Sequence, residues 1–164
     1  MAMTTEQLAT LRAYVEAHAD LLALDGNLTG LADALNADVA PDFIVTRTTI
    51  SRHLIVTGES MEATVFLWAG NGYIGRTPGE LAAFRDMFND TGNVDPRKPN
   101  IQAAFADIFS GTGNAALNRA HIVAMTKRKA SRFEHAFATG TGSLAVPGVL
   151  VLEGPISYQD LVGM

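Results

Sequence analysis

The hydrophobic positions of the chain recur mostly at helical spacing, and one helical pattern occurs twice. Residues 82–93 read AAFRDMFNDTGN, and residues 103–114 read AAFADIFSGTGN. Each copy places two phenylalanines four residues apart, which brings both rings onto one face of a helix. Each copy ends in Thr-Gly-Asn, where glycine accepts the left-handed backbone that ends many helices. The repeat predicts two neighbouring helices, at about 78–89 and 100–110, that pack together.

Capping patterns indicate where other helices begin. Residues 77–80 read Thr-Pro-Gly-Glu, which combines an N-cap, a proline at the first helical position and a capping box. Thr4 and Gln7 make a similar capping box ahead of an apolar stripe that reaches Leu22. A shorter apolar stripe covers residues 28–36. We therefore expect a first helix that begins at Thr4 and is broken by Asp25-Gly26-Asn27, and a second helix over about 28–36.

A long helix is predicted from Asn114 to about Phe137. Alanine, valine and phenylalanine side chains recur there at near-helical spacing, and Asn114 is suited to the N-cap position. Five basic residues would share this helix: Arg119, Lys127, Arg128, Lys129 and Arg132.

Two stretches have the composition of strands. Residues 43–46 and 64–68 are rich in β-branched and aromatic side chains, and each fits a short strand. Residues 51–55, between them, fit a short helical turn equally well. The Gly-Asn-Gly of residues 70–72 predicts a tight turn.

The C-terminal residues differ in character from the rest of the chain. Residues 138–143 read as a loop, 149–152 as a compact β run, and 156–159 as its potential partner strand after the turn at Gly154-Pro155. The pattern predicts an α+β, mainly α fold. A helical body would cover residues 1–137, and a loop with a β-hairpin or extended arm would cover 138–164. Because an isolated hairpin is marginal in water, this segment is expected to pack on the body or on another subunit.

Composition narrows the class of protein. A chain of 164 residues with 48% hydrophobic residues can form a packed core, and we expect a single domain. Cysteine is absent, which excludes disulfides, thiolate zinc sites and thiol catalysis. No stretch offers the ~18–20 apolar residues of a membrane span, and the N-terminal residues do not read as a signal peptide. We therefore expect no membrane contact.

The net charge of −5 is divided unevenly along the sequence. Residues 1–96 contain five Lys/Arg against thirteen Asp/Glu, whereas residues 97–164 contain seven against four. One acidic and one basic surface would suit head-to-tail association of subunits. The alternative is that these charges scatter over solvent-facing helices.

The residues that most often carry catalysis do not form a motif. The glycine pairs at 111–113 and 140–142 lack the third glycine of a dinucleotide fingerprint, whereas Gly70, Gly72 and Gly75 have its G-x-G-x-x-G spacing and are interpreted as turn glycines. The histidines lack the spacing of three or four residues that a zinc site on one helix needs, and solvent-facing or lightly hydrogen-bonded rings are expected. They are His18, His53, His121 and His135. The chain is therefore interpreted as not an enzyme, with no catalytic, cofactor-binding or metal-binding residue.

The basic residues leave two interpretations open. Lys127, Arg128, Lys129 and Arg132 have the charge to neutralise phosphates of a nucleic acid. No stacking motif of aromatic residues accompanies them, and the chain is acidic overall. A protein contact or a solvated helix face is the preferred interpretation, and a nucleic-acid partner is not expected.

Three strings carry a resemblance to a known family. They are residues 100–105 (NIQAAF), 134–142 (EHAFATGTG) and 153–160 (EGPISYQD). With them the chain resembles a family of small proteins encoded among the structural genes of tailed bacteriophages, from the N-terminal helix to the C-terminus. The resemblance implies a virion component of the neck or tail, assembled in the host cytoplasm, and not an enzyme.

The leading hypothesis is a head–tail connector, an adaptor-like subunit of a neck ring. Its partners would be other copies of the chain and neighbouring virion proteins such as portal or tail components. Extended backbone can pair with a partner's strand, and the expected interface residues are Val149, Val151, Ile156, Tyr158 and the basic residues Lys127, Arg128, Lys129 and Arg132. The alternatives are a tail-terminator, tail-tip or capsid-surface protein, or a tail assembly chaperone absent from the virion.

Overall fold

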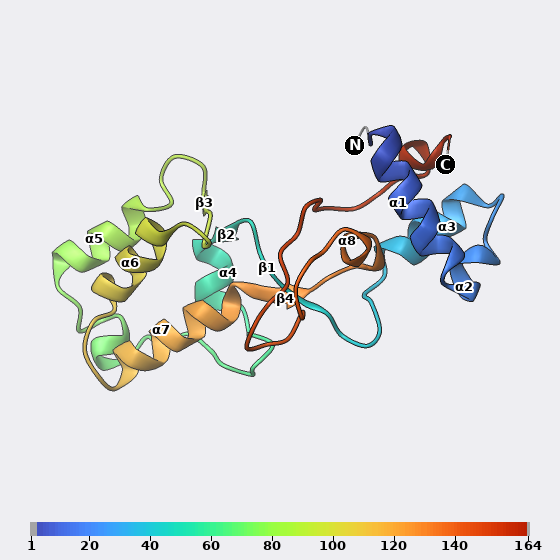
Figure 1. Ribbon diagram of the computed structural model, residues 1–164. Coiled ribbons are helices and arrows are strands. Elements are labelled where there is room, and N and C mark those ends of the chain that lie inside the picture. The colour runs from blue at the N-terminus through green and yellow to red at the C-terminus, as the bar shows by residue number, and fades with distance from the viewer. Residues whose placement is uncertain (1–2, 164) are drawn as a thin grey trace. The chain divides into compact units, whose positions relative to one another are not determined.

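The computed structural model describes residues 3–163, and the chain divides into two compact units. Unit 1 comprises residues 1–45 and 129–164, and unit 2 comprises residues 46–128. Helices dominate both units and the strands are short, so the expectation of an α+β, mainly α fold is confirmed. The division differs from the expected boundary at residue 137, because the C-terminal residues belong to the same unit as the N-terminal helices (Figure 1).

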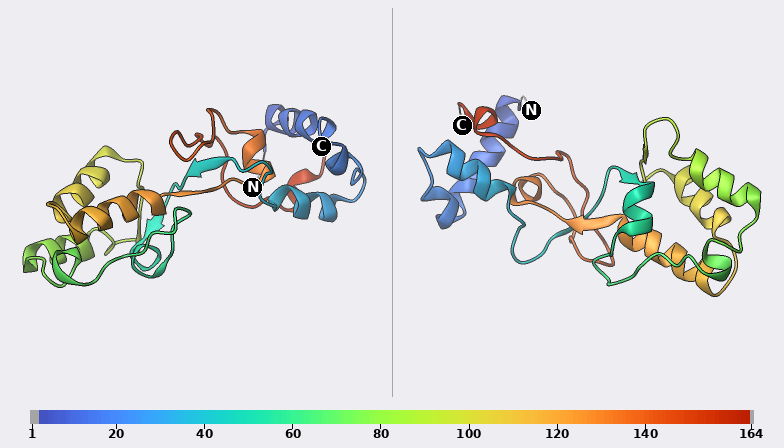
Figure 2. Two further views of the ribbon diagram at one scale, coloured as in Figure 1. Left: turned by 90° about the horizontal axis from the view of Figure 1, so that it is seen from below. Right: turned by 180° about the vertical axis from the view of Figure 1, so that it is seen from behind.

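Unit 1 is built from short helices contributed by both stretches of chain. The N-terminal stretch supplies α1 (Thr5–Glu16), α2 (Ala19–Leu22) and α3 (Leu28–Asn36). The C-terminal stretch supplies α8 (Arg132–Ala136) and the 3-10 helix η2 (Tyr158–Leu161). Both views in Figure 2 show η2 beside the N-terminal helices.

The expected first helix is two helices. The capping box of Thr4 and Gln7 forms as predicted, but α1 ends at Glu16 and α2 starts after His18. The backbone of His18 is extended, and its Nδ1 lies 2.7 Å from the carbonyl oxygen of Tyr14. That oxygen is the one a continuing helix would pair with the N–H of residue 18, so the ring takes the place of the helical bond.

The core of unit 1 joins residues that are far apart in the sequence. Phe133 of α8 is fully buried and shares a hydrophobic cluster with the leucines of α1 and α3. Ile156 and Leu161 from the C-terminal segment complete it. The buried members of this cluster are Leu11, Val15, Leu21, Leu31, Ala32, Leu35, Phe133, Ile156 and Leu161.

The prediction of one long helix from residue 114 to about residue 137 is wrong. Helix α7 (Asn114–Met125) ends before β4 (Lys127–Lys129), which forms a two-stranded sheet with β1 (Ile44–Thr46). Backbone hydrogen bonds with the residues on either side of β1 support the extended conformation, such as that from the N–H of Ala130 to the oxygen of Phe43 (2.8 Å). The basic residues 127–132 therefore do not share one helix.

The C-terminal hairpin does not form. Instead of pairing with 156–159, Val149 exchanges two backbone hydrogen bonds with Thr139, at 3.0 and 2.9 Å. Ile156 is bound by the side chain of Asn36, whose Oδ1 accepts from its N–H (2.8 Å) and whose Nδ2 donates to its oxygen (2.7 Å). The segment is largely irregular and follows the surface of its own unit, because local side chains and loops satisfy its backbone.

Unit 2 contains the predicted repeat. The two copies form α5 (Pro78–Asp86) and α6 (Pro99–Ile108), which contact each other. All four repeat phenylalanines are buried in one cluster: Phe84, Phe88, Phe105 and Phe109. The predicted capping box at Thr77 is also present.

A small antiparallel sheet links the other elements of unit 2. Strands β2 (Ile50–Ser51) and β3 (Asn93–Val94) pair with Ile50 opposite Val94. The helical turn expected at 51–55 is present as α4 (Arg52–Thr57), capped by Ser51. The Gly-Asn-Gly turn is the 3-10 helix η1 (Gly70–Gly72).

Residues 64–68 are not a strand, although strand was one expectation for them. The buried Asn118 on α7 replaces a strand partner there, since its Oδ1 accepts from the N–H of Leu67 (2.7 Å) and its Nδ2 donates to the oxygen of Leu67 (3.0 Å). Its Nδ2 also lies 2.9 Å from the oxygen of Gly72. One buried amide thus holds this segment against α7.

No helix within residues 3–163 has the length and apolar character needed to cross a bilayer.

Removal of one large core side chain from either unit should destabilise it. Phe105→Ala in unit 2 and Phe133→Ala in unit 1 should each lower the free energy of unfolding by roughly 3–5 kcal/mol, because each buried ring leaves a cavity. Urea denaturation measures this, with the exposed Val123→Ala as the control. Near-neutral values for either phenylalanine would contradict the described cores.

Candidate functional site

The C-terminal segment carries the four apolar or aromatic residues that were expected at an interface. Val149, Val151 and Tyr158 are exposed at 64%, 68% and 51% of their surface. Ile156 is only 3% exposed and belongs to the core of unit 1, so it cannot reach a partner while that core is intact. The expectation of an interface role for Ile156 is therefore corrected to a structural one.

Three further exposed side chains in the same segment were not singled out from the sequence. They lie among loop residues, where no periodic pattern separates inward from outward positions. Together with the three above they define the C-terminal apolar set: Leu144, Val146, Val149, Val151, Tyr158 and Val162. Exposed large apolar side chains are available for protein–protein contacts.

Two glycines hold this segment close to β1. Gly148 donates its N–H to the oxygen of Ile44, and Gly142 accepts from the N–H of Ile44, both at 2.7 Å. A Cβ on Gly142 or Gly148 would lie within 2.3 Å of the ring of Phe43, closer than carbon atoms approach. Only glycine fits at both positions, so the backbone that presents Val146 and Val149 is fixed against the unit.

The expected basic interface residues mostly pair with acids of the same chain. Lys127 lies 2.8 Å from Glu62, and Lys129 lies 2.8 Å from Asp42. Arg132 forms a two-point ion pair with Asp20. Arg128 also has an interaction within the structure. Their first role is therefore to stabilise their own units, and contact with a partner remains a prediction.

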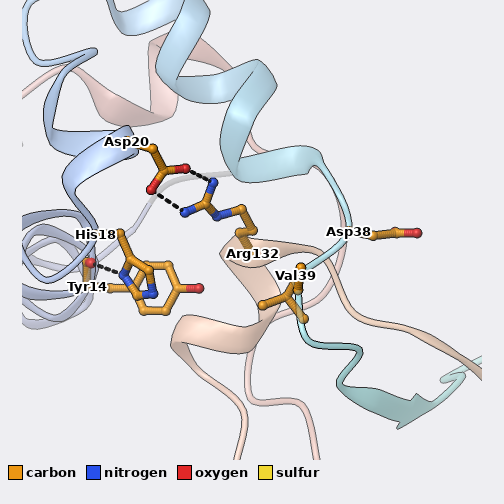
Figure 3. Close-up of a pocket in the computed structure, with 7 residues that line it drawn as sticks. Tyr14, His18, Asp20, Asp38, Val39 and Arg132 are labelled. Carbon is orange, nitrogen blue, oxygen red and sulfur yellow. Dashed lines mark hydrogen bonds and ion pairs between the residues drawn. The ribbon is translucent and has the colours of Figure 1, made fainter.

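A polar pocket in unit 1 contains the Arg132 pair (Figure 3). Its cavity measures about 290 Å³ and is lined by Tyr14, His18, Asp20, Asp38, Val39, Ala40 and Arg132. Asp20 and His18 come from the start of α2, Tyr14 from α1 and Arg132 from α8. The rings of Tyr14 and His18 pack with centroids 4.2 Å apart. The sequence offered no sign of this arrangement, because its residues come from both ends of the chain.

The ion pair in this pocket controls the charge of Asp20. The hydrogen bonds from Arg132 lower the pKa of Asp20 from 3.8 to about 2 and raise the pKa of Arg132. Because the folded pKa lies below the ordinary value, the pair stabilises unit 1 above about pH 4. This contribution is lost as the pH falls toward 2. The arginine is already bound by a carboxylate, so the pair fastens α2 to α8 instead of awaiting a ligand.

His135 lies beside this pocket. Its Nδ1 is 3.2 Å from the hydroxyl of Tyr14, and its ring packs against Phe43 with centroids 4.7 Å apart. Burial lowers the pKa of His135, and the charge of His18 lowers it further. Burial likewise raises the pKa of Tyr14. Both shifts favour the neutral forms, and the lowered pKa of His135 makes this cluster sensitive to acid.

His121 departs from the expectation of a solvent-facing or lightly bonded ring. It is fully buried in unit 2, with Nδ1 2.9 Å from the hydroxyl of Thr64 and Nε2 2.8 Å from the oxygen of Ile55. Both ring nitrogens thus have a partner inside the unit. Within residues 3–163, no group of three histidine or acidic side chains is arranged to hold a metal ion.

Comparison with known families, curated proteins and solved structures gave no match for this chain.

Lowering the pH should reduce the free energy of unfolding of unit 1, because His135 becomes protonated. The pKa of His135 in the folded protein lies below the ordinary value of 6.5. As the pH drops from 7.5 to 5.5, the unfolded chain therefore binds the proton before the folded protein does, and the free energy of unfolding falls. His135→Asn should show a smaller drop than the wild type in urea denaturation at these two pH values. His53→Asn, which removes an exposed histidine, is the matched control. An unchanged pH dependence in His135→Asn would contradict this assignment.

Proposed function

We propose that this chain is a structural protein of a tailed-bacteriophage virion, a subunit of the head–tail connection that acts through protein–protein contacts and not as an enzyme. Its partners in this proposal are further copies of itself, arranged in a ring, and neighbouring portal or tail components. The resemblance of residues 100–105, 134–142 and 153–160 to phage structural-gene proteins supports the origin.

The C-terminal apolar set is the observation that carries the proposal. Six large apolar side chains between Leu144 and Val162 are exposed, although the same segment buries Ile156 and Leu161. Exposed apolar surface is costly in water and is covered favourably in an assembly. Repetition around a ring turns many such weak contacts into a stable joint.

The backbone of the C-terminal segment is ordered, which also suits it to binding a partner. It is held against β1 through Gly142 and Gly148, so it offers side chains on a backbone that is already ordered. An ordered surface loses less conformational entropy on binding than a disordered arm does. Contact through side chains such as Val149 and Val151 is therefore favoured over folding of an arm on the partner.

Substitution tests this interface better than truncation does. Removal of residues 144–164 would also remove Ile156 and Leu161 from the core, and loss of incorporation would then report unfolding. Val149→Asp with Val151→Asp changes only exposed side chains. Incorporation of this variant into particles should fall at least about tenfold, the effect expected when charge is forced into an apolar contact.

The matched control is Val123→Asp, which places the same charge on an exposed valine of α7 in unit 2. It should enter particles normally, and circular dichroism should show wild-type helix content for both proteins. Incorporation of the Val149/Val151 variant at the wild-type level would contradict the role of the apolar set.

Copy number tests the place in the particle. Quantitative peptide mass spectrometry of purified particles should find about six to twelve copies per virion, the number expected for a single ring of subunits. Hundreds of copies would indicate the capsid surface or tail tube instead. Complete absence would contradict a virion role and favour an assembly chaperone.

A further inference from the structure

The two units differ in the sign of their charge. Unit 1 contains three Lys/Arg and ten Asp/Glu, a net charge of −7, whereas unit 2 contains nine and seven, a net charge of +2. The two units therefore keep the opposite signs of net charge that the two halves of the sequence have. Unit 1 of one copy and unit 2 of another therefore carry net charges of opposite sign.

Unit 2 contains a pocket suited to such an attraction. Its cavity measures about 370 Å³ and lies beside the β2–β3 sheet. The pairing of Ser51 with Asn93 brings the start of α4 next to the loop that follows α5. The pocket is lined by Ser51, Arg52, His53, Val56, Arg85, Phe88, Asn89 and Gly92, and no acidic residue is among them.

The two arginines of this pocket are exceptional in the chain. Of the other seven arginines, six make a hydrogen bond or ion pair within the structure, and Arg128 also has an interaction there. Arg52 and Arg85 make neither with any residue in the described part of the chain, and both are exposed. Two guanidinium groups line one cavity that has no carboxylate among its lining residues, and they form a site for a partner's carboxylates.

We propose that this pocket binds the acidic α2–α3 region of unit 1 in a second copy of the chain, which gives head-to-tail association. The assignment rests on the proposed function as a ring subunit and names the contact that would build the ring. The partner carboxylates are Asp25 and Asp33, which are exposed and have no ion pair with the described residues. Leu22, exposed next to Asp25, offers an apolar side chain to Val56 and Phe88 at the pocket.

Head-to-tail geometry follows from the placement of the two halves of the contact. The arginines lie on unit 2 and the aspartates on unit 1, so each copy carries one of each and the interface is heterologous. Such contacts close into rings when the rotation between copies allows it. The contact is electrostatic at its centre, so added salt weakens it.

Self-association of the full-length protein tests the proposal by analytical ultracentrifugation at low and high salt. The wild type should associate at low salt and dissociate as salt is added. Arg52→Glu with Arg85→Glu, and separately Asp25→Lys with Asp33→Lys, should each weaken association at least about tenfold. A mixture of the two reversed proteins should associate again, because the swapped charges are complementary. The control Arg97→Glu with Lys98→Glu makes the same charge change in unit 2 outside the pocket and should associate as the wild type does.

Several outcomes would overturn the proposal. A wild-type protein that stays monomeric at low salt and high concentration would do so, as would arginine-dependent binding of inorganic phosphate or DNA without self-association. Loss of association in the arginine variant alone, with the aspartate variant unaffected, would reject the named partner residues. Thermal unfolding of each variant confirms that it folds. If the protein is monomeric in solution but present in particles, the proposed contact is wrong and the proposed virion role is retained. If the protein associates but is absent from particles, only the virion role is wrong.

Discussion

The fold of unit 1 depends on the return of the C-terminal residues to the N-terminal helices. Its core combines Leu31 and Leu35 of α3 with Phe133 of α8 and Ile156 near the C-terminus, so neither stretch can bury its apolar side chains alone. All of unit 2 lies between them in the sequence. Closure of so long a loop costs entropy that only the completed core repays. The C-terminal segment is therefore a structural part of unit 1, and its surface role depends on that.

Two asparagines satisfy backbone that no strand pairs. Asn36 binds both the N–H and the oxygen of Ile156 in unit 1, and Asn118 binds both groups of Leu67 in unit 2. An amide side chain offers a donor and an acceptor side by side, as a neighbouring strand does. In each unit one side chain therefore fixes an irregular segment, and the residues beside it, such as Val65 and Tyr158, remain exposed.

The parts of the fold that depend on neighbouring residues were predictable from the sequence. The repeat helices, the capping boxes at Thr4 and Thr77 and the stripe over 28–36 have signals within a few residues, and all are present. The break after Met125, the irregular path of 64–68 and the burial of Ile156 depend on distant partners, which no periodicity reveals. The candidate sites divide in the same way. Val149 and Val151 were named from the sequence as interface residues, and both are exposed. Arg52 and Arg85 line one pocket only because strands β2 and β3 pair, which the sequence did not reveal.

Amide hydrogen exchange of the isolated full-length protein tests most directly whether the C-terminal segment is part of the fold. The amides of Gly148, Val149 and Ile156 all donate hydrogen bonds within unit 1. These amides should exchange by the same opening as the amides of α3, because both belong to one cooperative core. If the amides of residues 148–156 exchange at the rate of an unfolded chain while those of α3 stay protected, the C-terminal segment is a detached arm. That result would contradict its place in the core of unit 1.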